Sequence, residues 1–452
     1  MRKVWAVAVN TVKQALRLKV AAAFVVLLVV LLVVMSWTVT GDGTLRGQLQ
    51  TFVSYGISLT NILLSTLTII VSVYTLCSDF AQRQVYTVLT KPIRRYQLIA
   101  GKFLGVLILD AMLLVFFGGV IYAVAIGMPY IKGSSEEEIG VVKNEFYTAR
   151  RGLVREEFDV SAEVEREYDR LRRTGQLPQG VSERKIREDL TEIRQRQKLS
   201  ASVGEAVSWH FDNVAPFDPN EELYVKFKYD VSVNPPDLQV YSRWVIGGGR
   251  EFEEGSDDKI YIIDRKDIIR TNREFRVPVD ALTEDGHLSV RFLNIPLNDT
   301  VVMFPPQDGF EVLYKAGTFT GNFVRGLMLI FFRLVFLICL GLAAGSFLSF
   351  PVAVLFCFAI FFTSILSGFV LESIQFLEGE AGAAYNYTIK PLIHFLPRFD
   401  RFNPSEFLVS ASYISWSLVG EAVGIMVFVK SGILLLISMV IFGTREIARV
   451  II

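Results

Sequence analysis

Six apolar runs of about 20 residues each constrain this chain more than any other feature. A helix of that length spans the hydrocarbon core of a bilayer and satisfies its own backbone hydrogen bonds there. The runs cover residues 20–39, 57–76, 104–126, 327–350, 352–370 and 423–442. A hydrophobic fraction of 52% and a charged fraction of 20% agree with them. The sequence therefore predicts a polytopic α-helical membrane protein with six spans.

The basic residues near the span ends predict the orientation, because Lys and Arg are enriched on the cytoplasmic side. They cluster before the first run, between the second and third runs, and after the sixth. Even numbers of spans separate these three stretches. We therefore expect both termini and the loop 79–102 in the cytoplasm of a cell with a bacterial-type inner (plasma) membrane. Residues 130–319, and an external loop at 371–417 between spans five and six, then lie outside.

Residues 1–19 combine apolar positions at helical spacing with Arg2, Lys3, Lys13 and Arg17. This pattern favours an amphipathic helix in the membrane interface over a simple extension of the first span. We expect spans one to three within residues 20–129 and spans four to six within residues 320–452.

The stretch 130–319 differs in composition from the rest of the chain. It holds 27 basic and 36 acidic residues, so it is net acidic while the remainder is net basic. Residues 130–208 are rich in charge with apolar residues three and four apart, which predicts a helical hairpin. From residue 209 to 319 apolar residues alternate, with a turn signal at 284–286, which predicts a β-sandwich. The predicted fold is thus a six-span frame with an α+β extracytoplasmic domain between spans three and four.

Three aromatic residues of this β-rich part, Trp209, Tyr241 and Trp244, allow two interpretations. They can stack on a sugar ring, or they can fill the core of the sandwich, which is the commoner role. An extracytoplasmic protein or a glycan is the partner that we expect for this domain.

The cytoplasmic loop 78–102 is the most informative stretch. Residues 81–90 can form a short helix, which Pro92 ends because proline disfavours a helical residue before it. Such a helix on the cytoplasmic face suits docking of a partner; the alternative is a basic loop that only faces lipid headgroups.

This loop resembles the coupling helix and following turn in permease subunits of type-two ABC transporters. The resemblance rests on Lys91-Pro92-Ile93-Arg94-Arg95 followed by Gly101-Lys102. Residues 7–17, 396–403 and 442–446 resemble the lead-in helix, the external segment before span six and the chain end of the same family, in particular the multi-copper enzyme maturation and gliding-type subgroup. The insert of 130–319 departs from its compact members.

The resemblance implies a cytoplasmic ABC ATPase subunit that carries ATP and Mg, and a second permease copy or a related permease. It places a coupling helix and turn at residues 79–95. The expected ATPase-coupling residues are Arg83, Gln84, Tyr86, Thr87, Lys91, Pro92, Arg94 and Arg95.

Motifs for chemistry on this chain itself are missing from the sequence. It has no GxxxxGK[ST] phosphate loop, and its three histidines and three cysteines lack the spacing of a metal, disulfide or catalytic site. The charge balance gives no reason to expect nucleic acid as a partner. We therefore expect no catalytic residue, no metal and no cofactor on this chain.

Two basic residues, Arg333 and Lys430, lie about 10 Å inside the spans from the outer side, six and seven residues past the start of their apolar runs. One interpretation is that they snorkel outward or pair with Glu372 and Glu421 near the outer ends. The other is that they line a vestibule and contact a lipid or an anionic substrate.

The function predicted from these features is the permease subunit of an ATP-driven ABC transporter, which couples ATP hydrolysis on a separate subunit to export or to a conformational change in its external domain. The alternative is a non-transporting membrane anchor or sensor that displays a glycan- or protein-binding domain. A membrane-bound glycan enzyme has the weakest support, because no acid/base pair emerges.

Overall fold

The structure is a computed structural model that describes residues 2–81, 94–153, 158–177, 183–214, 222–248, 259–283, 285–306, 309–374, 391 and 396–444. It divides into two compact units. The membrane unit comprises Met1–Ala149 and Thr318–Ile452, and the insert unit comprises Arg150–Gly317.

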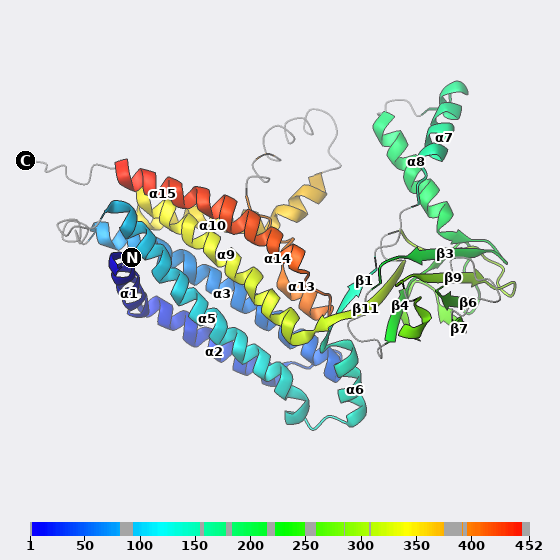
Figure 1. Cartoon of the computed structure of the whole chain (residues 1–452), viewed down its shortest axis with the longest axis horizontal. Helices are drawn as coiled ribbons and strands as arrows, with labels where there is room; N and C mark the ends of the chain where they lie inside the picture. Colours follow the sequence, from blue (N-terminus) through cyan, green and yellow to red (C-terminus); the bar gives the residue numbers. More distant parts are fainter. Residues whose placement is uncertain are drawn as a thin grey trace, which may run out of the picture. The chain divides into compact units, whose positions relative to one another are not determined.

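The membrane unit is helical (Figure 1). Six segments of its described part are long and apolar enough to cross a membrane, which confirms the predicted six-span frame. They are α2 (Lys19–Thr38), α3 (Leu45–Ala81), α5 (Arg95–Ile131), α9 (Phe319–Phe347), α10 (Phe350–Ile374), and the continuous run of α14 (Trp416–Ala422), the π-helical η2 (Val423–Ser431) and α15 (Gly432–Thr444). The shorter helices are α1 (Arg2–Leu16), α6 (Glu136–Glu145) and α13 (Pro404–Val409).

Helices α3 and α5 are much longer than the apolar runs that predict them. Each has 37 residues, about 55 Å at 1.5 Å per residue, against a bilayer core of about 30 Å. Both therefore extend past the apolar core, where polar side chains such as Arg46 and Arg95 do not interrupt the helix. Hydropathy alone predicts the apolar segment of each helix and misses the polar extensions at its ends.

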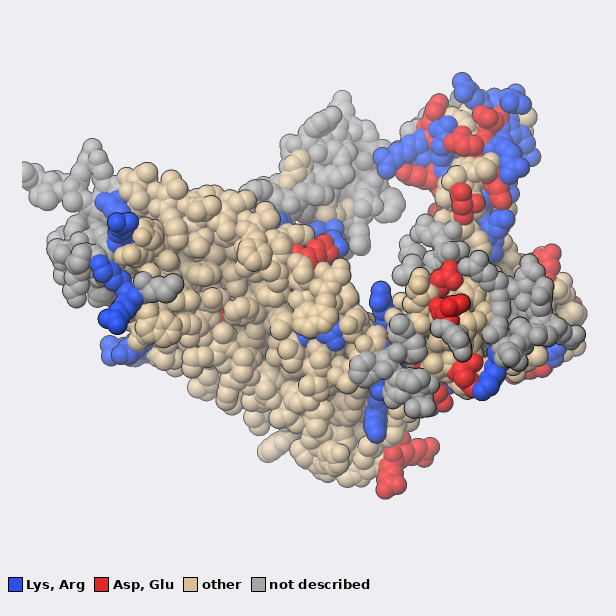
Figure 2. All heavy atoms as spheres, in the orientation of Figure 1, with Lys and Arg blue, Asp and Glu red and all other residues tan. Residues whose placement is uncertain are grey.

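Successive spans are antiparallel, so the membrane unit has two ends (Figure 1). The termini side holds α1 and the end of α15, and the insert side holds the end of α5 and the start of α9. On the face shown in Figure 2, a wide uncharged band separates basic side chains at the termini side from charged ones at the insert side. This band is what a bilayer-spanning surface requires.

Helices α3 and α9 form the centre of the membrane unit. Within their most apolar windows, 67% and 78% of the residues are buried, against 17% for α2 and 22% for the α14–α15 run. Buried polar residues follow one face of α3 three and four positions apart: Asn61, Ser65, Thr68, Ser72 and Thr75. Such residues at helix contacts hydrogen-bond locally and let helices pack closely in a membrane.

The described part of the insert unit contains three sheets. Their strands are β1 (Thr148–Gly152), β2 (Ser200–Ala201), β3 (Ala206–Phe211), β4 (Glu222–Phe227), β5 (Asp230–Val231), β6 (Gln239–Gly247), β7 (Tyr261–Ile268), β8 (Arg273–Pro278), β9 (Leu288–Asn294), β10 (Val302–Met303) and β11 (Phe310–Thr318). Two four-stranded sheets have the orders β1-β11-β4-β8 and β3-β9-β6-β7, and a small one has the order β2-β10-β5.

Aromatic side chains join the two larger sheets into a sandwich. Trp209 of β3 stacks on Phe310 of β11 with ring centroids 3.9 Å apart, and Trp244 of β6 lies 4.8 Å from Phe227 of β4. Both tryptophans are buried, which decides for the core interpretation at these two positions. Tyr241 is partly exposed, and the Lys266 ammonium lies 4.6 Å from its ring centre.

The strands begin earlier than the sequence predicts. The stretch 130–208, expected to be helical, also contributes β1, β2 and the start of β3, while α6 packs in the membrane unit. A short edge strand of charged residues such as β1 is invisible to periodicity because its pairing with β11, not its own pattern, makes it a strand. The turn signal at 284–286 falls between β8 and β9, which belong to different sheets.

The predicted helical hairpin is present as α7 (Ser161–Arg173) and α8 (Glu183–Lys198). Ion pairs connect the two helices: Arg187 with Glu165 at 2.9 Å, and Lys198 with Glu163 at 3.2 Å. Charges of both signs cover the hairpin, as Figure 2 shows, so it is a solvated element rather than an anion-binding patch.

Candidate functional site

The base of the membrane unit, on its termini side, is built around the two helices that flank residues 82–93. Asp79, near the end of α3, forms an ion pair of 2.6 Å with Lys102 of α5, and both side chains are nearly inaccessible. The Lys102 ammonium also donates to the Thr75 carbonyl. A buried pair that keeps hydrogen-bond partners fixes the distance between its helices, because separating it leaves an uncompensated charge. The pair therefore fixes where the segment 82–93 leaves and re-enters the helices.

Helix α1 packs tightly across the start of α5. A Cβ atom on Gly101 would lie 2.5 Å from Cβ of Val7, and one on Gly105 would lie 2.7 Å from the Ala8 carbonyl oxygen. The buried face of α1 consists of Ala8, Thr11 and Ala15, while Lys13 is exposed. Gln14 on α1 donates to the Ser78 hydroxyl on α3 at 2.9 Å. The amphipathic helix is thus also an integral part of the base.

The expected coupling residues divide into two groups. Arg83, Gln84, Tyr86, Thr87, Lys91 and Pro92 lie outside the described residues, as does the predicted coupling helix at 81–90 beyond its first residue. Arg94 is exposed directly before α5, whereas the Arg95 guanidinium donates to the carbonyls of Phe442 and Gly443, at 3.3 and 2.7 Å. Arg95 thus satisfies two backbone carbonyls at the end of α15 and joins the last span to the base.

On the insert side, both intramembrane basic residues bind one segment of backbone. Arg333 of α9 donates to the Phe399 carbonyl at 2.8 Å, and Lys430 of η2 donates to the Leu396 carbonyl at 2.5 Å. The Arg333 guanidinium also lies 4.6 Å from the centre of the Phe399 ring. The sequence places the two cations at one depth, and the structure supplies the segment that they share.

This segment, residues 396–402, is held on its other side by α10. Asp400 accepts a hydrogen bond from Ser367 at 2.9 Å, and the Phe399 amide donates to the Ser364 carbonyl at 3.1 Å. A Cβ atom on Gly368 would lie 2.0 Å from an Asp400 carboxylate oxygen. Irregular backbone at this depth is stable only when protein groups satisfy it, which these contacts achieve.

Of the two glutamates expected near these cations, the structure describes the side chain of Glu421 alone. Glu421 pairs with Arg401 at 2.9 Å. The side chain of Glu372 lies outside the described residues. The structure therefore brings Arg333 and Lys430 together through the segment 396–402 and not through Glu421.

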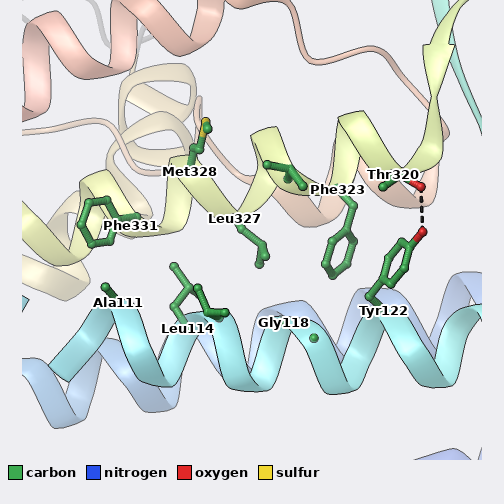
Figure 3. Close-up of a pocket in the computed structure, with 12 residues that line it drawn as sticks. Ala111, Leu114, Gly118, Tyr122, Thr320, Phe323, Leu327, Met328 and Phe331 are labelled. Atoms are coloured by element: carbon green, nitrogen blue, oxygen red, sulfur yellow. Dashed lines mark hydrogen bonds between the residues drawn. The ribbon is translucent and has the colours of Figure 1, made fainter. Parts of the chain in front are cut away.

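An apolar groove of about 540 Å³ lies between α5 and α9 (Figure 3). Leu114 and Gly118 of α5 line one wall, and Leu327 and Phe331 of α9 line the other. At its insert-side end the Tyr122 hydroxyl and the Thr320 hydroxyl are 2.7 Å apart. Gly118 allows α5 and α9 to approach each other closely here, since a Cβ atom on Gly118 would lie 2.6 Å from a Leu327 methyl carbon.

Sequence reasoning missed two structural cations. Lys102 was expected as one of the basic residues that set topology and as part of the Gly101-Lys102 motif, and not as a structural cation, yet it is the buried partner of Asp79. Its position beside the apolar run, 23 residues from an aspartate at the end of the preceding span, is the signal that could have found it. Arg325 donates to the Ile414 carbonyl at 2.6 Å and lies 4.3 Å from the Tyr413 ring centre. Nothing local in the sequence marks Arg325, because its partner is 89 residues away.

Metal and thiol chemistry find no support in the described ranges. These hold no group of three or more His, Cys, Asp or Glu side chains that could bind a metal ion. None of the three cysteines, all of which lie in the described ranges, forms a disulfide, and two of them are buried.

The two helices that flank residues 82–93 lie within a stretch that matches a family model. Residues 14–144 match the model of the family described as ABC-2 family transporter protein. The match supports an ABC-2 type permease. It covers α2, α3, the segment 82–93, α5 and most of α6, together with the end of α1. No curated protein matches the chain.

An ABC-2 type permease is a membrane component that is not itself catalytic, and the family implies an ABC ATPase as partner. The insert unit lies outside the matched residues.

Proposed function

We propose that this chain is the transmembrane permease subunit of an ATP-driven ABC transporter, and that residues 82–93 dock a separate cytoplasmic ATPase subunit. The observation that carries the proposal is the buried Asp79–Lys102 pair, which joins the two helices flanking that segment within the residues matched by the family model. ATP and Mg bind to the partner subunit. A second copy of this chain or a related permease completes the membrane channel.

The proposed coupling runs through α3, α5 and α15. A push on the segment 82–93 reaches α3 and α5 together because the Asp79–Lys102 pair holds them. It reaches the last span through the bonds of Arg95 to the Phe442 and Gly443 carbonyls. The membrane is the bacterial-type inner membrane in this proposal, with the termini side in the cytoplasm; the exposed Lys13, Arg17, Lys19 and Arg94 support that orientation.

In this proposal, the output of the cycle, which is export of a transported group or movement of the external domain, occurs at the insert side of the membrane unit. In the proposal, Arg333 and Lys430 hold the segment 396–402 in place, so a change in the helix packing moves that segment. The insert unit then follows from the ends of α5 and α9 by chain continuity. This gives export or a conformational change of the external domain as the output.

The test is co-purification of the full chain with its ATPase, comparing the wild type with a variant that carries Arg83→Glu and Tyr86→Ala. We expect the double variant to lose assembly or ATPase stimulation at least about tenfold, which corresponds to about 1.4 kcal/mol of docking free energy. The matched control is Lys13→Glu, a charge reversal at an exposed position of α1, which we expect to leave assembly and ATPase stimulation unchanged.

Two results would contradict the proposal. Unchanged assembly and stimulation in the double variant would remove the docking role of the segment. The intact wild-type protein could also be purified under mild conditions that keep partner proteins bound. If no nucleotide-binding subunit came with it, the anchor or sensor function would be favoured.

A further inference from the structure

Among the described residues, one carboxyl group in the middle of the membrane unit has no partner of opposite charge. Asp110 of α5 is 1% exposed and lies 15 residues past Arg95, about 22 Å along the helix. One of its oxygens, Oδ2, lies 2.9 Å from the Thr68 hydroxyl of α3. The other, Oδ1, is buried with no hydrogen-bond partner in the described structure.

The hydrogen atoms at this site can be counted. The Thr68 hydroxyl has one hydrogen, and two acceptors lie within its reach: the Leu64 carbonyl at 2.8 Å and Asp110 Oδ2 at 2.9 Å. If Asp110 were ionised, both oxygens could only accept, so the two contacts would compete for that single hydrogen. If Asp110 carries a proton on Oδ2, the carboxyl donates to the Thr68 oxygen while Thr68 donates to Leu64, and both contacts are satisfied.

Within the part of the chain that the structure describes, the charged groups of the helices packed against Asp110 do not supply a counter-ion. On its own helix Lys102 is two turns away and pairs with Asp79 of α3. Arg46, at the start of α3, pairs with Glu145. From α9, Arg333 and Arg325 donate to the Phe399 and Ile414 carbonyls.

The other helices packed against α5 add nothing nearer. Helix α15 contains no charged residue, and Lys13 of α1 is exposed at the termini side. The remaining titratable groups of α3, α5 and α9 are thiols and phenols, which never carry a positive charge: Tyr55, Tyr74, Cys77, Tyr96, Tyr122, Tyr130 and Cys339. A carboxylate at Asp110 would thus be an unpaired buried charge, which is the costliest state of such a group in a membrane.

We propose that Asp110 is a proton-binding site between α3 and α5, occupied at neutral pH, with the proton on Asp110 Oδ2 and donated to the Thr68 hydroxyl oxygen. Binding of the proton lets the two helices close on each other. Its release leaves a carboxylate whose oxygens need water or a cation, so α3 and α5 must part to admit one. These are the helices that precede and follow residues 82–93.

The first experiment compares the infrared absorption spectra of the wild type and of single variants, each as the full chain in lipid nanodiscs at pH 7. We expect the carbonyl stretch of a protonated carboxylic acid in the wild type, its loss in Asp110→Asn, and its retention in the control Asp42→Asn, which changes an exposed loop carboxylate. Thr68→Val should leave the band in place but shift it to the higher frequency of a weaker hydrogen bond. A wild-type spectrum without the band, or a band unchanged in Asp110→Asn, would overturn the proposal whether or not the other variants fold.

The second experiment measures the thermal midpoint of the same proteins between pH 6 and 9. A proton held in the folded state and absent from the unfolded state makes the wild type lose stability as the pH rises. Asparagine cannot ionise, and its amide can donate to the Thr68 hydroxyl oxygen. The thermal midpoint of Asp110→Asn should therefore fall less than that of the wild type between pH 6 and 9. Parallel curves for the two proteins would contradict a proton at Asp110.

Discussion

At the scale of single residues, the buried Asp79–Lys102 pair makes the sharpest prediction. Replacing Lys102 by Met leaves the Asp79 carboxylate uncompensated in a dry site, so we expect a loss of about 3–5 kcal/mol in the free energy of unfolding. Adding Asp79→Leu to that variant should recover much of the loss, because two apolar side chains replace two charges. Thermal or denaturant unfolding of the four proteins of this double-mutant cycle gives the answer, with Lys13→Met as the exposed control. A loss in the double variant equal to the sum of the two single-variant losses would mean that the charges do not interact.

A second residue-scale prediction concerns acid stability of the insert unit. Asp280 accepts hydrogen bonds from Lys259 at 2.7 Å and from Tyr261 at 2.5 Å, and these bonds lower its pKa below the ordinary value of 3.8. A lowered pKa in the folded state contributes stability that is complete above the unfolded pKa and disappears as the pH falls through the folded one.

We therefore expect Asp280→Asn to lower the thermal midpoint at pH 7 and to approach the wild type as the pH falls below about 3.8. Asp299→Asn, at another exposed aspartate, serves as the control. A difference between wild type and Asp280→Asn that stays constant down to pH 2 would show that the ion pair is not its source.

At the scale of elements, the contact of α1 with α5 depends on two glycines. A side chain at Gly105 would collide with the backbone of Ala8 and the side chain of Thr11, at 2.7 Å each. We expect Gly105→Val to displace α1 and to cost about 1–3 kcal/mol, with protease cleavage within α1 as the readout. Gly119→Val, on the same helix, has open space around it and should leave α1 protected. Equal cleavage of the two variants would refute this packing.

The segment 396–402 makes the second prediction at this scale. Arg333→Gln removes the donor to the Phe399 carbonyl, which is buried and would lose its partner. We expect faster amide hydrogen exchange across residues 396–402, with a local loss of about 1–3 kcal/mol of protection. Arg401→Gln breaks only a partly exposed pair with Glu421 and should change the exchange little. If the two variants exchanged alike, Arg333 would not hold the segment.

At the scale of the whole molecule, the boundary of the insert unit is testable. A fragment from Thr148 to Thr318 contains every strand of the three sheets, so it should fold alone and give dispersed NMR spectra. A fragment from Trp209 to Phe319, the β-rich part expected from alternation, lacks β1 and β2 and begins inside β3. We expect that shorter fragment to be disordered or aggregated, because its sheet edges lose their partners. Good spectra from the shorter fragment would restore the earlier boundary.

The sequence by itself determined the six-span frame, the order of its parts and the presence of a β-rich domain between spans three and four. Each of these follows from local composition and period, which act over about 20 residues or fewer. The loop motif Lys91-Pro92 with Gly101-Lys102 also directed attention to the region that the family model matches. The basic residues Arg333 and Lys430 could be placed at one depth from their positions in the runs alone.

Only the tertiary structure decided which groups meet. Arg333 and Lys430 share the segment 396–402, Lys102 pairs with Asp79, and Arg95 reaches the end of α15, 347 residues away. The strand β1 exists because β11 pairs with it, and the Thr68 hydroxyl meets the Asp110 carboxyl because α3 and α5 pack together there. These outcomes depend on helix and strand packing between distant parts of the chain, and no local pattern encodes such a contact. The burial that makes each buried charge significant arises from the same packing.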